Sequence, residues 1–352
     1  MLLDIGPEIS KSKVHFVATD SLALPLADEQ LAQDLIREMT QVEDDLRAAV
    51  ANADSLVDDA SRHLVSAGGK RLRPLLTLLV SQLGTGVSDD VRKAAVVVEL
   101  THLASLYHDD VMDSAPLRRG APSAHEVWGN NVAILTGDLL FARASALTSE
   151  LGPEAVGIQA RTFERLCMGQ LQETLGPRDG ADPVAHYIQV LADKTASLLA
   201  TSALFGAKLA GAAPEHERVV TQYGELVGVA FQLADDVIDL TSTGDVTGKT
   251  QGTDLREGVP TMPVLLLRQI VASPEGTPQD GELLAEIDSD LSSDEALASV
   301  VEKLRVHRVV DMTRQKSQDV ARQAIAELDG LPDGSVKDAL VKFAEVLVDR
   351  VA

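Results

Sequence analysis

The chain has a single cysteine among its 352 residues, Cys167, and only 3% of its residues are aromatic. One cysteine excludes a disulfide framework and is typical of a protein in a reducing compartment. Basic residues are also few, since 31 lysines and arginines stand against 54 acidic residues and give a formal net charge of −23. Binding nucleic acid needs a basic surface to neutralise phosphates, so this balance argues against that class of partner.

Two sequence signals for membranes are also missing. No run approaches the roughly 18–20 apolar residues that cross a bilayer. The first residues lack the basic-then-apolar pattern of a secretory signal. We therefore expect a cytoplasmic protein without a membrane span. Apolar residues still make up 45% of the chain, which is enough for a sizeable core.

Helical periodicity dominates the sequence, and no segment alternates convincingly as a strand would. We predict an all-α fold, with one large helical bundle rather than two domains. Residues 1–27 are expected to form a loose N-terminal arm, residues 28–352 a single domain, and residues 273–291 an exposed acidic loop. The predicted helices cover 28–52, 54–67, 74–84, 89–114, 122–128, 131–149, 153–174, 183–211, 215–241, 260–272, 292–302, 307–328 and 335–351.

An acidic triplet, Asp-Asp-x-x-Asp, occurs twice, each time inside an apolar helical pattern. The first copy is Asp109, Asp110 and Asp113, and the second is Asp235, Asp236 and Asp239. Positions i and i+4 share one face of a helix, so each copy points at least two carboxylates the same way. Carboxylates placed in an apolar stripe are costly unless something neutralises them. A hard divalent cation, which prefers oxygen ligands, is the obvious candidate.

The alternative explanation is a pair of solvated acidic helix faces, which is what most charge runs are. With 33 aspartates in the chain, random placement gives about 0.3 matches to the motif, so one copy would mean little. The neighbours Val111, Met112, Val237 and Ile238 are apolar, which weighs against a solvent-facing position. We predict that the two triplets form facing walls of one central cleft.

The few clustered basic residues are informative because the chain is so acidic. The segment 68–74, GGKRLRP, places Lys70, Arg71 and Arg73 just before a predicted helix start. Backbone amides at a helix start together with cations suit a phosphate. Alone, however, such a loop is more often a solvated turn.

Other polar residues lie near the triplets in the sequence. They are Arg118 and Arg119 after the first triplet, His102 two helical turns before it, Gln232 just before the second triplet, Lys249 in the following Gly-rich loop, and Lys194 with Thr195 inside a helix. A lone histidine such as His102 is more often a satisfied core residue. Together the set suits a diphosphate, which carboxylates bind only through bridging Mg²⁺ while Lys and Arg contact the outer oxygens. Two groups of basic residues indicate two diphosphate positions, one with metal and one without.

Seven segments occur in the order and spacing of a known family. They are 68–74 (GGKRLRP), 102–113 (HLASLYHDDVMD), 118–120 (RRG), 135–140 (LTGDLL), 193–197 (DKTAS), 231–240 (FQLADDVIDL) and 248–258 (GKTQGTDLREG). On these motifs the chain resembles the trans-isoprenyl (polyprenyl) diphosphate synthases of medium- or long-chain type over roughly residues 30–350. The resemblance implies an all-α homodimer with a deep central cavity. It also implies sequential head-to-tail addition of isopentenyl diphosphate to an allylic diphosphate.

The resemblance also implies roles for individual residues. The expected metal ligands, for about three Mg²⁺ ions held with diphosphate, are Asp109, Asp113, Asp235 and Asp239, with Asp110 and Asp236 beside them. Expected contacts to the allylic diphosphate are Arg118, Gln170, Lys194, Thr195, Gln232 and Lys249. Expected contacts to isopentenyl diphosphate are Lys70, Arg73, His102 and Arg119. One departure is Val259, where the family often has lysine, and this leaves a cation missing near the second triplet.

Product length can be argued in part from the sequence. Ala104 and Ser105 lie one turn before Asp109 and are small, so no bulky side chain there would close the cavity. We expect products of C30 or longer, although both residues could simply be helix-packing positions. A geranylgeranyl or farnesyl diphosphate synthase remains an alternative. Long products are apolar, so peripheral membrane association is plausible.

Three other classes of function remain to be separated. A terpene cyclase would share the acidic metal site, but it stabilises cations with aromatic walls, and this chain has few aromatic residues. A non-catalytic synthase subunit should have lost a triplet or a basic partner. A divalent-cation buffer would not need Lys70, Arg118 and Arg119.

Overall fold

The structure is a computed structural model that describes residues 15–19, 22–241 and 251–349. Almost every element in this part of the chain is helical, so the all-α prediction is confirmed. The elements are β1 (His15–Thr19), β2 (Leu22–Leu26), α1 (Glu29–Val50), α2 (Ser55–Ser66), α3 (Leu72–Ser81), α4 (Asp89–Met112), β3 (Leu117–Arg118), β4 (Ala121–Pro122), α5 (Ala124–Trp128), α6 (Asn130–Glu150), α7 (Pro153–Leu175), α8 (Pro183–Leu191), the π-helical turn η1 (Ala192–Ala196), α9 (Ser197–Leu209), α10 (Pro214–Thr241), α12 (Thr253–Arg256), α13 (Met262–Val271), α14 (Pro278–Ile287), α15 (Asp294–Arg305), α16 (Arg308–Glu327), the 3₁₀ turn η2 (Leu328–Gly330) and α17 (Ser335–Asp349).

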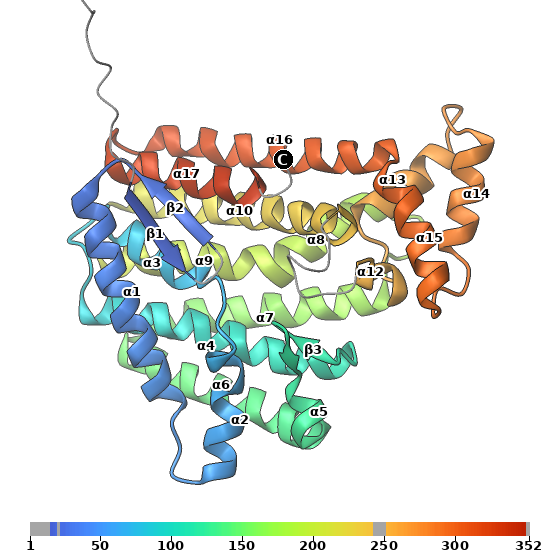
Figure 1. Ribbon diagram of the computed structural model, residues 1–352. Coiled ribbons are helices and arrows are strands. Elements are labelled where there is room, and N and C mark those ends of the chain that lie inside the picture. Colours follow the sequence, from blue (N-terminus) through green and yellow to red (C-terminus); the bar gives the residue numbers. More distant parts are fainter. Residues whose placement is uncertain (1–14, 20–21, 242–250, 350–352) are drawn as a thin grey trace, which may run out of the picture.

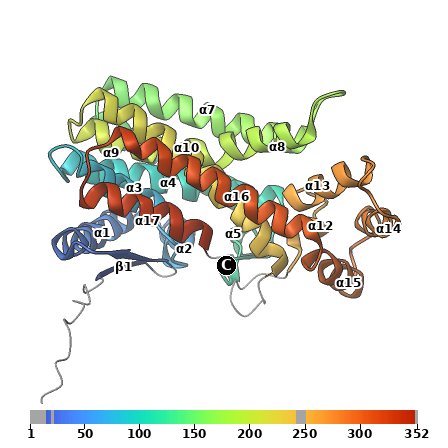
Figure 2. The ribbon, with the colours of Figure 1, turned by 90° about the horizontal axis from the view of Figure 1, so that it is seen from above.

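Long helices run side by side along the molecule (Figure 1). Helix α9 packs against both α4 and α10, while α6 covers another side of α4 and α16 covers another side of α10. Helices α14 and α15 lie at the end of the molecule opposite the β1–β2 hairpin (Figure 2). The two helices that carry the acidic triplets, α4 and α10, are thus both central elements of the bundle.

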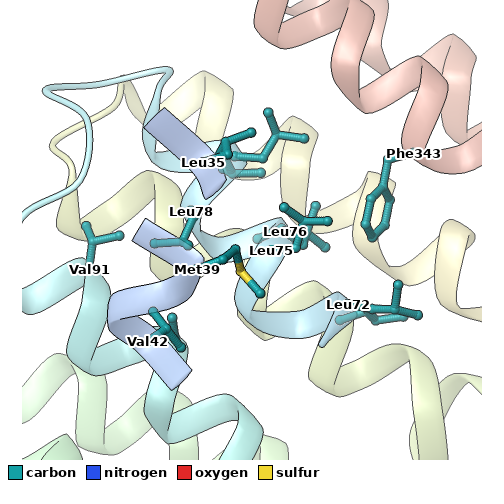
Figure 3. Close-up of a cluster of buried hydrophobic side chains, with 14 of the residues drawn as sticks. Leu35, Met39, Val42, Leu72, Leu75, Leu76, Leu78, Val91 and Phe343 are labelled. Atoms are coloured by element: carbon teal, nitrogen blue, oxygen red, sulfur yellow. The ribbon is translucent and has the colours of Figure 1, made fainter. Parts of the chain in front are cut away.

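The main core forms where amphipathic α1 meets the more deeply buried α3. Helix α1 starts at the Asp28 side chain, which accepts a hydrogen bond from the Leu31 amide at 3.0 Å, as an N-cap should. Its buried residues recur every three or four positions, which is the helical apolar stripe. Figure 3 shows Leu35 and Met39 of α1 beside Leu75 and Leu76 of α3. Burying each such side chain stabilises the fold by about 1.5–3 kcal/mol.

The expectation that the N-terminal arm is loose is wrong for the part that the structure describes. Strands β1 and β2 pair in antiparallel register, with Val17 opposite Leu24. Val17, Leu24 and Leu26 are buried, and β2 packs against α17. Two strands of five residues are too short to show clear alternation. Pro25 within the second strand also argued against a strand, since proline is confined to edge strands.

The acidic loop expected at residues 273–291 is also wrong, because α14 occupies its centre. This helix starts with a capping box, in which the Thr277 hydroxyl accepts from the Asp280 amide and the Asp280 carboxylate accepts from the Thr277 amide. Such a box satisfies two amides that the helix itself leaves unpaired. Leu283 is the one apolar side chain of α14 that is buried. Because so little of the helix faces the core, its sequence shows no strong apolar stripe that would predict it.

One helix, α6, is long and apolar enough to cross a membrane by length and composition alone. A third of its most apolar window is buried in this protein, 33%, and it packs against α4 and α7. The remainder of α6 includes the exposed side chains of Ile134 and Leu135, 40% and 66% accessible.

Candidate active site

The first acidic triplet lies at the C-terminal end of α4, where Asp113 caps the helix. The negative end of the helix dipole disfavours carboxylates there, and neither α4 nor α10 has a basic residue in its last turn. Burial raises the pKa of Asp109 to about 6, while Lys194 opposes this shift and Asp113 adds to it. Asp109 is therefore a carboxylate whose charged form needs a nearby cation.

Asp110 points the other way, into the core. It is fully buried, and one of its oxygens, Oδ1, accepts from Arg118 Nε at 2.6 Å. Burial raises the pKa of Asp110, and Arg118 opposes that shift. Arg118 stands on the short β3–β4 ribbon, so this ion pair fixes the ribbon against the end of α4. Asp110 thus orients Arg118 instead of facing the other triplet.

Asp236, the central residue of the second triplet, is an equivalent anchor on α10. Its carboxylate accepts from the Tyr187 hydroxyl, at 3.0 and 2.9 Å to its two oxygens, and from the Met262 amide at 3.1 Å. Burial, followed by the charge of Asp254, raises its pKa well above the usual range. Asp236 therefore ties α10 to α8 and to the start of α13.

Replacing Tyr187 by phenylalanine is expected to destabilise the protein by about 1.5–3 kcal/mol, because the buried Asp236 loses a donor. The matched control is Tyr223→Phe, in which an equally buried hydroxyl donates to the neutral Leu340 carbonyl at 2.6 Å. That change should cost only about 1 kcal/mol. Urea unfolding of both variants measures the difference, and equal losses would contradict the anchoring role of Asp236.

The outer aspartates of the second triplet, Asp235 and Asp239, are both partly buried on α10. Glu173 of α7 links the two regions electrostatically, since its charge acts on the pKa of both Asp109 and Tyr187. Within the described residues, no three His, Cys, Asp or Glu side chains form a group that could hold a metal ion by themselves. The four-aspartate metal site therefore stays a prediction.

Lys194 and Thr195 lie on the π-helical turn η1 between α8 and α9. The Lys194 ammonium pairs with Glu173. Burial lowers the pKa of Lys194, but Glu173 and Asp109 together raise it above its usual value. Lys194 is thus a firmly charged group beside the first triplet.

The two arginines of segment 68–74, Arg71 and Arg73, have different hydrogen-bond partners. Arg71 adopts left-handed backbone, and its buried guanidinium pairs with Glu99 at 2.8 Å and with Glu43. Arg73 keeps a buried Nε that has no hydrogen-bond partner. Burial lowers the pKa of Arg73 to about 10, Glu99 opposes this, and Arg119 adds to it.

Arg119 completes a cationic cluster with Arg73, and His102 lies beside it. The Arg119 guanidinium lies under Gly69, where any side chain would meet its Cζ at 2.7 Å, and it donates to the carbonyls of Leu64 and Gly68. Burial first, and then four neighbouring arginines, lower the pKa of His102 well below its usual value. An unpaired buried donor among cations suits an anionic ligand.

Of the other expected site residues, Gln170, Lys70 and Val259 lie in the described part of the chain. Gln170 lies on α7, three residues before Glu173, and its Oε1 is buried without a partner. Lys70 places its Nζ 5.2 Å from the centre of the Phe231 ring, which precedes Gln232 on α10. Lys249 lies outside the described residues. Val259 is partly buried and donates its amide to the Asp254 carbonyl at 2.9 Å.

The predicted product-length residues lie on the inner part of α4. Ala104 is fully buried. It packs closely against α6, since a Cβ atom added at Gly137 would lie 3.1 Å from the Ala104 carbonyl oxygen. Ser105 is partly buried and donates to the His102 carbonyl at 2.8 Å. Two surface cavities, of about 480 and 750 Å³, lie elsewhere, among α12–α15 and among α1, α4 and α6. The deep central cavity therefore stays a prediction.

Sequence patterns gave no role to four residues that shape this site: Glu173, Tyr187, Arg165, and Asp193 of the 193–197 motif. Glu173 could have been found, because it follows Gln170 by three positions on the same helix face. Tyr187, Arg165 and Asp193 act through tertiary contacts, for which the sequence has no local signal.

Comparison with known proteins places this arrangement in a family. The model of the polyprenyl synthetase family matches residues 54–304. The chain is 40% identical to nonaprenyl diphosphate synthase of Mycobacterium tuberculosis, over 95% of this chain and 98% of that protein. It is 31% identical to octaprenyl diphosphate synthase of Escherichia coli, over 92% and 98%.

Solved structures agree with these sequence relatives. A polyprenyl synthase from Caulobacter crescentus, complexed with calcium and isoprenyl diphosphate, superposes with a TM-score of 0.84 at 32% identity, over 92% of this chain and 98% of that one. A geranylgeranyl pyrophosphate synthase from Corynebacterium glutamicum, with the same ligands, gives 0.80 at 43% identity, over 93% and 99%. The expected family is confirmed: the chain belongs to the polyprenyl synthetase family.

Proposed function

We propose that the protein condenses isopentenyl diphosphate head-to-tail with an allylic diphosphate, and that it makes an all-trans polyprenyl diphosphate of C30 or longer. The observation that carries the proposal is the cationic cluster with the unpaired Arg73 Nε. His102, beside that cluster, and Asp109 stand seven residues apart on α4, which corresponds to about 10 Å along the helix. A metal-free anion site and an acidic site at this separation suit two diphosphate substrates.

Mg²⁺ fits the donor set at the ends of α4 and α10. Asp109 and Asp113 at the end of α4 and Asp235 and Asp239 at the end of α10 supply only carboxylate oxygens. The pKa of Asp109 is raised by burial even though Lys194 lies nearby, so a divalent cation would stabilise its charged form. We propose that these four residues hold three Mg²⁺ ions together with the allylic diphosphate. Bound Mg²⁺ would neutralise the charge that develops on the leaving diphosphate.

The protein's own side chains would do the rest of the work. Lys194 and Arg118, with Thr195, Gln170, Gln232 and Lys249, would hold the allylic diphosphate as its C–O bond breaks. Lys70, Arg73, His102 and Arg119 would hold isopentenyl diphosphate so that its double bond lies close to the new carbocation. We propose that the departed diphosphate then accepts the proton, because the aspartates serve the metal.

Incubation with Mg²⁺, radiolabelled isopentenyl diphosphate and farnesyl diphosphate tests this function. Reversed-phase sizing should show a ladder that ends at C30 or beyond. A product that stops at C20 would favour the alternative, a geranylgeranyl diphosphate synthase, which the 43% identity to the Corynebacterium enzyme keeps open. A cyclic hydrocarbon, or no consumption of isopentenyl diphosphate, would contradict the proposal.

We also propose that the protein is a homodimer that buries one face of α6 and α7. Large apolar side chains are exposed there, including Leu135 at 66%, Leu171 at 54% and Leu175 at 79%. Helices α6 and α7 pack against each other, and large exposed apolar side chains gathered on neighbouring helices often mark an interface. We also propose a cytoplasmic location, a peripheral association with membranes through the long apolar products, and a single domain over residues 28–352.

Leu135→Glu is expected to shift the dimer to monomer, because it buries a charge without a partner at the centre of that face. Sedimentation velocity measures the change in mass. The control is Leu56→Glu on α2, where the side chain is similarly exposed at 53% but lies on another part of the molecule. A Leu135→Glu protein with an unchanged sedimentation coefficient would contradict the interface.

A further inference from the structure

The residues Lys194 and Thr195 are presented by an unusual piece of backbone. The helical segment from α8 to α9 is interrupted by the π-helical turn η1, in which the Ser197 amide bonds to the Ala192 carbonyl, five residues back. A π turn is wider and less favourable than an α turn and usually persists where other contacts hold it. If η1 relaxed to α geometry, the helix would lose one residue of register, and the residues on one side would rotate by about 100°.

Two glycines hold this turn from opposite sides. A side chain on Gly169 of α7 would lie 2.6 Å from the Lys194 amide nitrogen and 3.0 Å from its Cα. A side chain on Gly228 of α10 would collide with the Cα of Ala196. The backbones of α7 and α10 thus approach η1 closely enough that only glycine fits at either contact.

One arginine bridges all three elements at this point. Arg165 of α7 donates from Nε to Asp193 Oδ1 at 2.7 Å and from Nη2 to the Ala192 carbonyl at 3.2 Å. The same guanidinium pairs with both carboxylate oxygens of Glu225 on α10. Arg165 therefore contacts the carbonyl that makes the π hydrogen bond and the side chain immediately before Lys194.

Asp193 is held on its other side as well. Its second oxygen accepts from Gln189 Nε2 at 2.7 Å, and its carbonyl accepts from the Ser197 hydroxyl at 2.7 Å. The residue is buried, with 8% exposure. If Arg165 were lost, Asp193 would keep a buried charge with only one neutral side-chain partner, which disfavours the present turn.

We propose that Arg165 is a positioning residue, which, through Asp193, Glu225 and the Ala192 carbonyl, holds the π-helical turn in the register that aims Lys194 and Thr195 at the allylic diphosphate. The ligand in this inference, the allylic diphosphate, rests on the proposed function. The contacts that Arg165 makes with the turn do not depend on that function. Arg165 itself touches no substrate in this scheme. Its guanidinium faces Asp193 and Glu225, whereas the Lys194 ammonium pairs with Glu173.

The test compares Arg165→Met and Arg165→Lys with the control Arg161→Met. Arg161 is exposed one turn earlier on α7 and makes no ion pair within the described residues. For Arg165→Met, the KM for the allylic diphosphate should rise about tenfold or more, because small displacements of a binding group are costly. The KM for isopentenyl diphosphate should stay within about twofold, because Arg73 and His102 lie on α3 and α4, whereas the partners of Arg165 lie on η1 and α10.

The lysine variant separates charge from geometry. Arg165→Lys restores the charge and should recover thermal stability, but a lysine cannot reproduce the planar fork that contacts three partners. Its allylic KM should therefore remain raised. A structural role alone would instead raise both KM values together, or restore both in the lysine variant, and either result would overturn the proposal.

Hydrogen exchange provides a readout that does not depend on turnover. In Arg165→Met, amides 192–197 should exchange at least tenfold faster, while those of α4 keep their wild-type rates. If wild-type protein consumed neither substrate, the proposed function would fail. Hydrogen exchange would still test whether Arg165 holds the π-helical turn. If Arg165→Met did not fold, Glu225→Gln would be measured in the same way, and unchanged exchange at 192–197 would reject the inference.

Discussion

Asp109→Asn is expected to lower turnover by a factor of about 10³ while making the metal-free protein more stable. The loss follows because one carboxylate that would hold the metal becomes a weak neutral ligand, and removing one preorganised electrostatic group commonly costs a factor of about 10²–10³. The gain follows because the wild-type carboxylate is partly buried at the negative end of α4, without a basic residue in the last turn.

The pKa of Asp109 sets the sign and the pH window of that gain. Its value rises from the usual 3.8 to about 6 in the folded protein. Above about pH 6 the folded protein holds an unfavourable charge, and asparagine removes a cost on the order of 2 kcal/mol. Below about pH 4 the carboxyl is protonated in both the folded and unfolded states, so the difference should vanish.

Assays at saturating Mg²⁺ and thermal melts in a chelator measure the two effects. Asp90→Asn is the matched control, because Asp90 is exposed in the first turn of the same helix, where a negative charge is favourable. It should change neither turnover nor stability by much. Near-normal turnover of Asp109→Asn would contradict the metal assignment.

The long helices were predictable because their apolar residues recur at helical spacing over many turns. Helices α1, α4 and α10 begin and end within a few residues of the predicted bounds. The β1–β2 hairpin and α14 were missed because each is short and acquires its stability from α17 or from a capping box. Tertiary packing, rather than local pattern, decides such elements.

The site was predictable at the level of motifs but not of individual side chains. The spacing of the triplets indicated a shared face, yet it could not show that Asp110 and Asp236 turn inward to Arg118 and Tyr187. The same limit applies to the π turn, because nothing in the sequence ADKTA distinguishes it from an α turn. Its geometry depends on Arg165 and two glycines from other helices.

The two arginines of 68–74, Arg71 and Arg73, should respond in opposite ways to the same substitution. Arg73→Met is expected to raise the KM for isopentenyl diphosphate about 100-fold or more and to stabilise the substrate-free protein. The first effect removes a cation that the diphosphate would pair with. The second removes a guanidinium whose buried Nε is unpaired and whose neighbour is Arg119.

Arg71→Met should do the reverse, because the guanidinium of Arg71 already has protein partners. Its loss leaves Glu99, which is 1% exposed, without the cation that pairs with it at 2.8 Å. Breaking a buried pair on one side costs about 3–5 kcal/mol. Urea unfolding should therefore show a large loss for Arg71→Met, and its substrate KM, where the protein still folds, should change far less than that of Arg73→Met. Equal stability losses in the two variants would show that Arg73 is a structural residue, and that the anion site lies elsewhere.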